Sequence, residues 1–193
     1  MLDKRVFYID GQWQAPAIAN DFEVINPSNE DPCAVISLGG QADTNAAVSA
    51  AKVSFDAWRE TSKEERLALI ENLAEIYMAR AEDMGGAISL EMGAPIAMAK
   101  AAQAGAGAGH IKTFIRAFKS FEFERELGSH APGDRILMEP VGVCGLITPW
   151  NWPMNQVTLK VIAGLIAGCT MILKPSEESP LNALLFAEMM HEA

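Results

Sequence analysis

Two short apolar runs near the carboxyl end of the chain are bounded by residues that break regular structure. Residues 143–148 form an uncharged, partly β-branched run that stops at Pro149, and residues 170–173 form a similar run. Apolar segments of this length between breakers are typical of strands that are buried on both faces. The pattern therefore predicts two buried strands here.

The segments after these two runs have helical periodicity. Between residues 154 and 167 apolar side chains recur every three or four positions, and Gly168 suits the left-handed conformation that often ends a helix. Ser179 and Pro180 offer an N-cap and a first-turn proline for a second helix that reaches Met189. The order strand, helix, strand, helix predicts parallel strands with right-handed crossovers, whose ligands bind beyond the carboxyl ends of the strands.

The first 40 residues have the pattern of antiparallel strands. Residues 6–9 and 12–13 flank the turn pair Asp10-Gly11, which predicts a hairpin. Residues 22–25 and 34–37 flank a turn-rich link and predict a second antiparallel pair. This end of the chain is expected to be peripheral.

Helices are predicted after residue 42. Asp43 can cap the first of them, and its packing face is made by Ala47, Ala51, Ser54 and Trp58. Thr61 or Ser62 with Glu64 or Glu65 offers a capping box for the second. The buried stripe of that second helix is made by Leu69, Ile70, Leu73 and Tyr77.

A short helix over residues 81–91 and a long one over about 95–119 are expected next, with Gly93 and Pro95 between them. Residues 105–109 alternate Gly and Ala, which invites comparison with a phosphate-binding loop. No strand precedes them, so close contact between helices or low-complexity filler is the better interpretation. From 121 to 140 two alternating runs flank Gly128 and Gly133 and predict a projecting antiparallel pair, for which a subunit contact is favoured.

Composition excludes several classes of partner. The 193 residues are 50% hydrophobic, enough for a core, and the net charge of −10 without a Lys/Arg cluster argues against nucleic acid. The uncharged interval between Glu139 and Lys160 is long enough to raise the question of a membrane span, but it contains three prolines and several amides, so a span is rejected. The N-terminus lacks a signal-peptide core, which predicts a cytoplasmic protein with reduced thiols. Cys33, Cys144 and Cys169 are widely spaced, so neither a metal site nor a disulfide is predicted.

Two polar residues end the two predicted parallel strands. Pro149 and Pro153 restrict the backbone around Asn151, so its amide has a nearly fixed place, and Lys174 follows the second strand. Both positions belong to the edge where ligands of parallel sheets bind. The alternative, in which Asn151 only satisfies the loop backbone and Lys174 is a solvated charge, stays open on these residues alone.

The motifs Ile147-Thr148-Pro149-Trp150-Asn151-Trp152-Pro153 and Leu173-Lys174-Pro175-Ser176-Glu177 resemble those of the NAD(P)-dependent aldehyde dehydrogenase superfamily. Residues 7–13, 24–27 and 57–58 agree with it in the same order. The resemblance implies an α/β aldehyde-dehydrogenase-like fold, with an incomplete Rossmann-like parallel sheet, N-terminal helices and a projecting antiparallel hairpin. It divides the chain at 1–120 (hairpins and helices), 121–140 (oligomerisation hairpin) and 141–193 (first βαβα of the NAD-binding sheet).

Site roles follow from the resemblance. It implies that Asn151 donates to the oxyanion of the substrate and that Lys160 acts nearby in orientation or proton movement, although Lys160 also fits a lysine that merely extends from a helix to solvent. It implies that Lys174 and Glu177 bind the adenosine ribose of the cofactor. The remaining cofactor contacts that it implies are Ile147, Thr148, Pro149, Trp150 and Ser176. A carboxylate at Glu177 would repel a 2′-phosphate, which favours NAD, with NADP possible.

The resemblance also shows what the 193 residues lack. In the superfamily the nucleophilic cysteine, the glutamate that activates water and the glycine-rich turn for the pyrophosphate all lie beyond residue 193. Two strands cannot form a complete doubly wound sheet, and no G-x-G-x-x-G or Walker motif is present, so the sequence looks cut. The expected function is therefore that of the N-terminal part of an enzyme that oxidises an aldehyde through a cysteine thiohemiacetal and thioester. That enzyme is expected to be a homodimer or homotetramer, and this part alone to be inactive. The alternative is a non-catalytic nucleotide-binding or assembly module.

Overall fold

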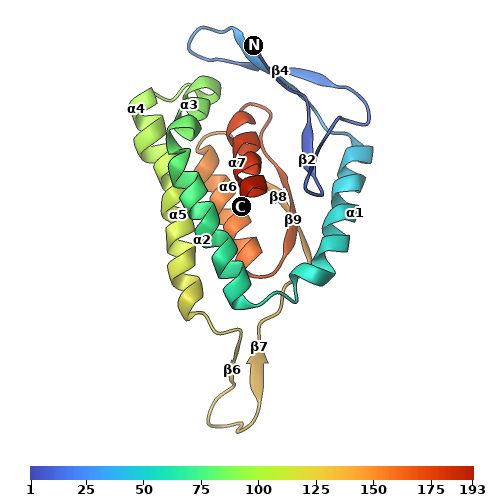
Figure 1. Cartoon of the computed structure of the whole chain (residues 1–193), viewed down its shortest axis with the longest axis vertical. Helices are drawn as coiled ribbons and strands as arrows, with labels where there is room; N and C mark the ends of the chain where they lie inside the picture. The colour runs from blue at the N-terminus through green and yellow to red at the C-terminus, as the bar shows by residue number, and fades with distance from the viewer.

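The computed structural model describes all residues from 1 to 193 and places a layer of helices beside small β-sheets (Figure 1). The strands are β1 (Leu2–Lys4), β2 (Phe7–Ile9), β3 (Gln12–Gln14), β4 (Asp21–Ile25), β5 (Pro32–Ser37), β6 (Glu124–Glu126), β7 (Arg135–Leu137), β8 (Val143–Ile147) and β9 (Thr170–Lys174). The helices are α1 (Gln41–Trp58), α2 (Lys63–Ala79), α3 (Ala81–Met92), α4 (Ile96–Met98), the π-helix η1 (Ala99–Ala104), α5 (Gly105–Ser120), α6 (Pro153–Ile166) and α7 (Leu181–Glu192). None of the helices has the length and apolar character needed to cross a membrane.

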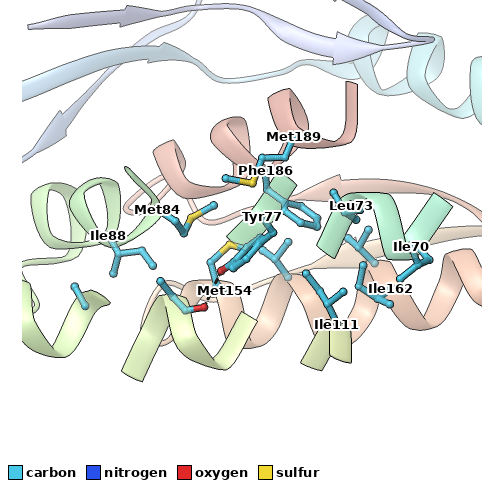
Figure 2. Close-up of a cluster of buried hydrophobic side chains, with 14 of the residues drawn as sticks. Ile70, Leu73, Tyr77, Met84, Ile88, Ile111, Met154, Ile162, Phe186 and Met189 are labelled. Atoms are coloured by element: carbon cyan, nitrogen blue, oxygen red, sulfur yellow. Dashed lines mark hydrogen bonds between the residues drawn. The ribbon is translucent and has the colours of Figure 1, made fainter. Parts of the chain in front are cut away.

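The main core lies among helices α2, α3, α5, α6 and α7 (Figure 2). Tyr77 is at its centre: its ring packs edge-on against Phe186 at a centroid distance of 6.2 Å, and its hydroxyl donates to the Ala104 carbonyl at 2.9 Å. The predicted stripe of α2 is therefore correct for Ile70, Leu73 and Tyr77, which are almost fully buried. Burial of these large side chains is the principal stabilisation of the helical layer.

Local capping decides where the first helices begin. Ser62 and Glu65 form the predicted capping box of α2: the Glu65 backbone donates to Ser62 Oγ, and the Ser62 backbone donates to the Glu65 carboxylate. The prediction that Asp43 is the N-cap of α1 was wrong by three residues. Gly40 holds that position, and Asp43, in the first turn, accepts from the Gly40 N–H at 2.8 Å. Ser54 is exposed, so it does not belong to the packing face of α1.

The predicted long helix after Pro95 is one continuous helical segment with a π-helical stretch, η1, inside it. Sequence periodicity gave no sign of this stretch. Two glycines allow the segment to approach its neighbours closely. A Cβ at Gly85 on α3 would lie 2.8 Å from the Lys100 Cα atom, and one at Gly107 would overlap the Tyr77 hydroxyl. Within the alternating run, the predicted close contact between helices is therefore made at Gly107, whereas a Cβ at Gly109 would meet nothing within 4 Å.

Gly107→Ala should destabilise the protein because Tyr77 is buried and cannot move away. The new methyl would lie 2.8 Å from the Tyr77 Cζ atom and 3.3 Å from the Met154 Cβ atom. Overpacking of this kind costs about 1–3 kcal/mol, which exceeds the gain of up to ~1 kcal/mol in helix propensity. Urea unfolding measures the change. Gly109→Ala is the matched control: no atom lies within 4 Å of its Cβ position, so it should be neutral or stabilising, and equal effects of the two variants would contradict the argument.

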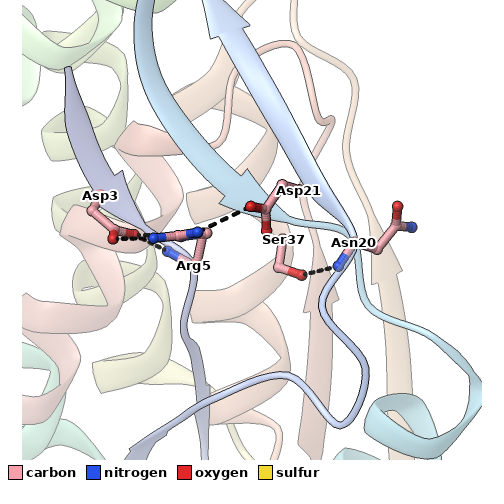
Figure 3. Close-up of polar contacts among 5 residues, drawn as sticks. All are labelled: Asp3, Arg5, Asn20, Asp21 and Ser37. Carbon is pink, nitrogen blue, oxygen red and sulfur yellow. Dashed lines mark hydrogen bonds and ion pairs between the residues drawn. The ribbon is translucent and has the colours of Figure 1, made fainter.

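The N-terminal strands form two small sheets. β2 and β3 make the predicted hairpin, with Asp10 and Gly11 both at positive φ as the tight turn requires. β4 and β5 pair antiparallel as predicted, and β1, which no pattern indicated, joins them by pairing parallel with β5. Figure 3 shows the polar contacts around this sheet, in which Arg5 donates to Asp3 and to Asp21.

The segment between α5 and β8 carries the projecting antiparallel pair, in which β6 lies beside β7 (Figure 1). Its strands are shorter than the two alternating runs predicted. Apolar side chains are exposed on and beside it, with Leu137 at 62% and Met138 at 50% exposure. The hairpin therefore leaves apolar surface that its own chain does not cover.

β8 and β9 pair in parallel, with α6 as the crossover between them. α1 packs on one face of this pair and α6 on the other, and the Thr170 hydroxyl donates to the Ala51 carbonyl of α1 at 2.7 Å. The prediction that β8 is buried on both faces was wrong, because Gly145 is exposed and Ile147 is 75% exposed. The sheet has only two strands, so no further strand lies beside the free edge of β8.

Candidate functional site

The carboxyl ends of β8 and β9 lie side by side and form a common rim. Ile147 is the register partner of Lys174, and the backbone N–H of Thr148 donates to the Lys174 carbonyl at 3.2 Å. Thr148 is 4% exposed, whereas Pro149 and Trp150 beyond it are exposed. Parallel pairing therefore brings the starts of the two sequence motifs to one edge, where ligands of parallel sheets bind.

The loop after β8 presents Asn151 between this rim and helix α6. Pro153 is the first residue of α6 and is buried, and Trp152 occupies the N-cap position without a side-chain cap. Asn151 itself is exposed, and its amide makes no hydrogen bond within the chain. Its donors are therefore free to bind a group outside the chain, so the alternative of an amide that satisfies its own loop has no support in the geometry.

Lys174 and Glu177 form an ion pair in the loop after β9. Lys174 Nζ donates to a Glu177 carboxylate oxygen at 2.7 Å, and the two side chains are 60% and 41% exposed. The hydrogen bond from Lys174 holds the pKa of Glu177 below its usual range, so this carboxyl is ionised at neutral pH. A donor and an acceptor side by side, both open to solvent, can bind a vicinal diol.

Ser176 and Lys160 form hydrogen bonds with residues outside this ion pair. The Ser176 hydroxyl accepts from the Glu178 N–H at 3.3 Å, and its carbonyl accepts from the Ser179 N–H at 3.2 Å, so Ser176 shapes the loop. Lys160 Nζ donates to the side chain of Gln156 at 2.9 Å, one turn earlier on α6, and not to Asn151 or Lys174. Strand pairing and hydrogen bonds join Ile147, Thr148, Lys174 and Glu177. No hydrogen bond joins Asn151, Lys160 or Ser176 to these four residues.

Residues 13–193 match the profile of the family described as the aldehyde dehydrogenase family. The chain belongs to this family. The resemblance to the aldehyde dehydrogenase superfamily that the sequence motifs indicated is therefore confirmed. Among similar aldehyde dehydrogenases, the 3-succinoylsemialdehyde-pyridine dehydrogenase of a Pseudomonas species is 47% identical over 193 residues, which cover 100% of this chain and 40% of that protein.

Solved aldehyde dehydrogenases share the fold closely. The enzyme from Bartonella henselae has a TM-score of 0.98 at 54% identity and is matched over 100% of this chain and 40% of its own. A mutant of aldehyde dehydrogenase C from Pseudomonas syringae, complexed with NAD+ and octanal, has a TM-score of 0.93 at 44% identity, with coverage of 97% and 38%. The predicted aldehyde-dehydrogenase-like fold is confirmed, and the chain spans about two-fifths of the length of the relatives it matches.

One buried carboxylate at the start of α7 in this aldehyde dehydrogenase chain belongs to neither of the two site motifs. Glu91 on α3 is 2% exposed, and its oxygens accept from the backbone N–H groups of Leu181 and Asn182 at 2.5 and 2.9 Å. The predicted N-cap role of Ser179 was wrong. Pro180 occupies the N-cap position, and Glu91 supplies the acceptor from another helix. Because Glu91 lies 90 positions before Leu181, no pattern in the sequence around residue 180 could indicate this acceptor.

Glu91 should make the stability of the protein depend on pH. Burial raises the pKa of Glu91 from 4.5 to about 7, against the opposing effect of the hydrogen bonds from Asn182 and Leu181. The folded state therefore keeps this proton at pH values where the unfolded state has lost it. The resulting stabilisation is complete below about pH 4.5 and is lost as the pH rises through about 7.

Urea unfolding at several pH values tests this expectation. The free energy of unfolding of the wild type, relative to that of Glu91→Gln, should fall between about pH 4.5 and 7 and then level off. Taking the difference removes the contribution of other titrating groups. A difference that rises with pH over this interval would contradict the assignment.

Proposed function

We propose that these 193 residues are part of an NAD-dependent aldehyde dehydrogenase, in which they supply one oxyanion donor and the site for the adenosine ribose. The observation that carries the proposal is the common rim, where the register pair Ile147 and Lys174 brings both motifs to one edge of a parallel sheet. Family membership and the NAD+ and octanal bound by the Pseudomonas syringae relative support the reaction class. The aldehyde itself stays unassigned.

In this proposal the Asn151 side chain donates a hydrogen bond to the oxygen of the aldehyde when a thiolate attacks its carbon. A donor placed where negative charge develops stabilises the transition state more than the ground state. Lys160 has the role of orienting this region, acting through its own helix. NAD, when bound, accepts the hydride that leaves the substrate carbon.

The residues on the rim fit the ribose part of such a cofactor. Glu177 is an ionised acceptor and Lys174 a donor, 2.7 Å apart and open to solvent, which suits two neighbouring hydroxyl groups. Ile147, Thr148, Pro149 and Trp150 would line the cofactor along the end of β8, and Ser176 would hold the loop. Donors for the pyrophosphate are assigned to residues beyond 193.

The nucleophilic cysteine and the general-base glutamate are likewise assigned to residues beyond 193. Burial raises the pKa of both Cys33 and Cys144, the opposite of what a reactive thiolate requires, and Cys169 is 4% exposed. In the Pseudomonas syringae relative the mutated cysteine has a number larger than 193. A cytoplasmic setting, where these thiols stay reduced, completes the proposal.

In this proposal each of three parts of the chain has its own role. Residues 1–120 serve as the helical support, 121–140 as a contact between subunits of a dimer or tetramer, and 141–193 as the first part of the cofactor sheet. The exposed apolar side chains Leu137 and Met138 of the hairpin support the second assignment.

An assay of NADH formation tests the proposed function. The full-length protein that carries these residues should reduce NAD with a simple aldehyde such as octanal, and the 193-residue chain alone should not. Turnover by the isolated chain would refute the assignment of the nucleophile. Absence of turnover by the full-length protein over a panel of aldehydes would favour the alternative of a non-catalytic module.

Glu177→Gln should reduce the preference for NAD over NADP. A charged hydrogen bond contributes about 1.5–3 kcal/mol, so its loss should raise KM for NAD roughly tenfold or more. Removal of the negative charge also lowers the repulsion of a 2′-phosphate, so the ratio of kcat/KM for NAD to that for NADP should fall. Glu178→Gln, at the next position in the same loop, is the matched control and should leave both values unchanged. An unaltered ratio in Glu177→Gln would refute the ribose assignment.

A further inference from the structure

Helix α7 begins immediately after the loop that carries Lys174 and Glu177, and its first turn is held by a residue from a distant helix. Glu91 accepts from Leu181 N at 2.5 Å through one carboxylate oxygen, and from Asn182 N at 2.9 Å and Asn182 Nδ2 at 2.7 Å through the other. N–H groups at the start of a helix have no partner within it, so an acceptor here satisfies them. Glu91 thus fixes α7 to α3.

The hydrogen bonds continue from Glu91 back into the loop. Asn182 Nδ2 also donates to the Ser179 carbonyl at 2.8 Å and to Ser179 Oγ at 3.1 Å. The Ser179 N–H donates in turn to the Ser176 carbonyl at 3.2 Å. An unbroken series of hydrogen bonds therefore joins the buried carboxylate to the residue next to Glu177.

The backbone of the loop 174–180 is consequently fixed at both ends, whereas the side chains of Lys174 and Glu177 form a hydrogen bond only with each other. At its start, the Thr148 N–H donates to the Lys174 carbonyl; at its end, Asn182 and Glu91 fix Ser179. Glu91, Asn182 and Ser179 are all buried, whereas the ion pair of Lys174 with Glu177 is open to solvent. The position of that pair is thus set by the backbone between these two fixed ends.

We propose that Glu91 is a positioning residue for cofactor binding: by holding the first turn of α7, it fixes the loop 174–180 so that Lys174 and Glu177 meet the adenosine ribose together. This inference rests on the proposed function of the ion pair. Glu91 is buried away from the rim and acts through Asn182 and Ser179. Loss of either carboxylate oxygen should therefore weaken cofactor binding without changing the chemical step.

Glu91→Gln in the full-length protein, assayed above pH 7 where the Glu91 carboxyl is ionised, is the test, because glutamine has the same length but offers one acceptor oxygen where the carboxylate offers two. The NH2 group of the glutamine is a donor and would face the N–H groups of the first turn of α7, so at least one of these N–H groups would lose its acceptor. KM for NAD should rise about tenfold, the equivalent of one lost hydrogen bond, and kcat at saturating NAD should change less than about twofold. In the absence of cofactor, amide exchange of residues 174–182 should speed up by a similar factor.

Met84→Ala controls for a loss of stability that has nothing to do with the loop. Met84 lies on the same helix, is fully buried in the main core and forms none of the hydrogen bonds described. Its substitution should lower the unfolding temperature and leave both KM for NAD and the exchange of residues 174–182 at wild-type values. An equal rise of KM in the two variants would overturn the proposal.

A second variant serves if Glu91→Gln does not fold. Asn182→Ala keeps both backbone N–H donors to Glu91 and removes the side-chain bonds from Asn182 to Glu91 and to Ser179, so KM for NAD and loop exchange should again rise. An unchanged KM in an active variant with a faster-exchanging loop refutes the role of Glu91. If the wild-type protein does not bind or reduce NAD, the proposed function itself is refuted. Results from variants of an active enzyme test only the role of Glu91.

Discussion

Replacing Asn151 by alanine in the full-length protein should lower kcat with an aldehyde by about 10²–10³-fold, the usual effect of removing one oxyanion donor. The amide is exposed and forms no hydrogen bond within the chain, so the free energy of unfolding should change by less than ~0.5 kcal/mol. KM for NAD should stay near its wild-type value because the ribose site lies in a different loop. Steady-state kinetics together with a urea titration measure these quantities.

Two variants complete the Asn151 experiment. Asn151→Asp keeps the size of the side chain and places a carboxylate where negative charge develops, so its loss of kcat should be at least as large. Asn45→Ala removes an equally exposed amide from α1 and should have wild-type kinetics. If Asn151→Ala loses less than about tenfold, this side chain is not an oxyanion donor.

Replacing Arg66 by alanine should produce the largest loss of stability, about 3–5 kcal/mol. Arg66 is 5% exposed, and its guanidinium donates to the Thr61 hydroxyl and to three backbone carbonyls. The three carbonyls belong to Trp58, Arg59 and Ile166. They lie at the carboxyl ends of α1 and α6, where a cation is favoured by the helix dipoles.

Thermal and urea unfolding measure the effect of Arg66→Ala. The substitution removes the donors to three carbonyls in a partly buried region and opens a cavity. Arg59→Ala is the control: its side chain is exposed and paired with Glu60, so the change should stay below about 1 kcal/mol. Similar losses in the two variants would show that the buried hydrogen bonds contribute little.

The elements that sequence reasoning placed correctly depend on local chemistry. The Ser62–Glu65 capping box, the turn at Asp10 and Gly11 and the left-handed Gly168 each need only residues within a few positions. The parallel order of β8 and β9 follows from their spacing about a crossover helix, and it also brings Lys174 to the same rim as Ile147. The starts of both site motifs could therefore be located before any coordinates.

The features that were missed depend on contacts between distant residues. Glu91 reaches α7 across 90 positions, and β1 pairs with β5 across more than 30. No periodicity encodes either, because a buried glutamate and an exposed one look alike in sequence. The exposure of Ile147 was missed for a related reason, since an apolar run does not tell how many neighbouring strands will cover it.

The π-helical turn η1 has a consequence for the spacing of the contacts on either side of it. Lys100, within η1, touches Gly85 of α3, and Gly107, a few residues after it, touches Tyr77 of α2. A π turn carries one residue more per hydrogen-bonded ring than an α turn, so it sets the angle between these two contacts around the helix axis. Deleting a single alanine from residues 99–104 would rotate one contact relative to the other. Segment length here is therefore as constrained as the identity of the two glycines.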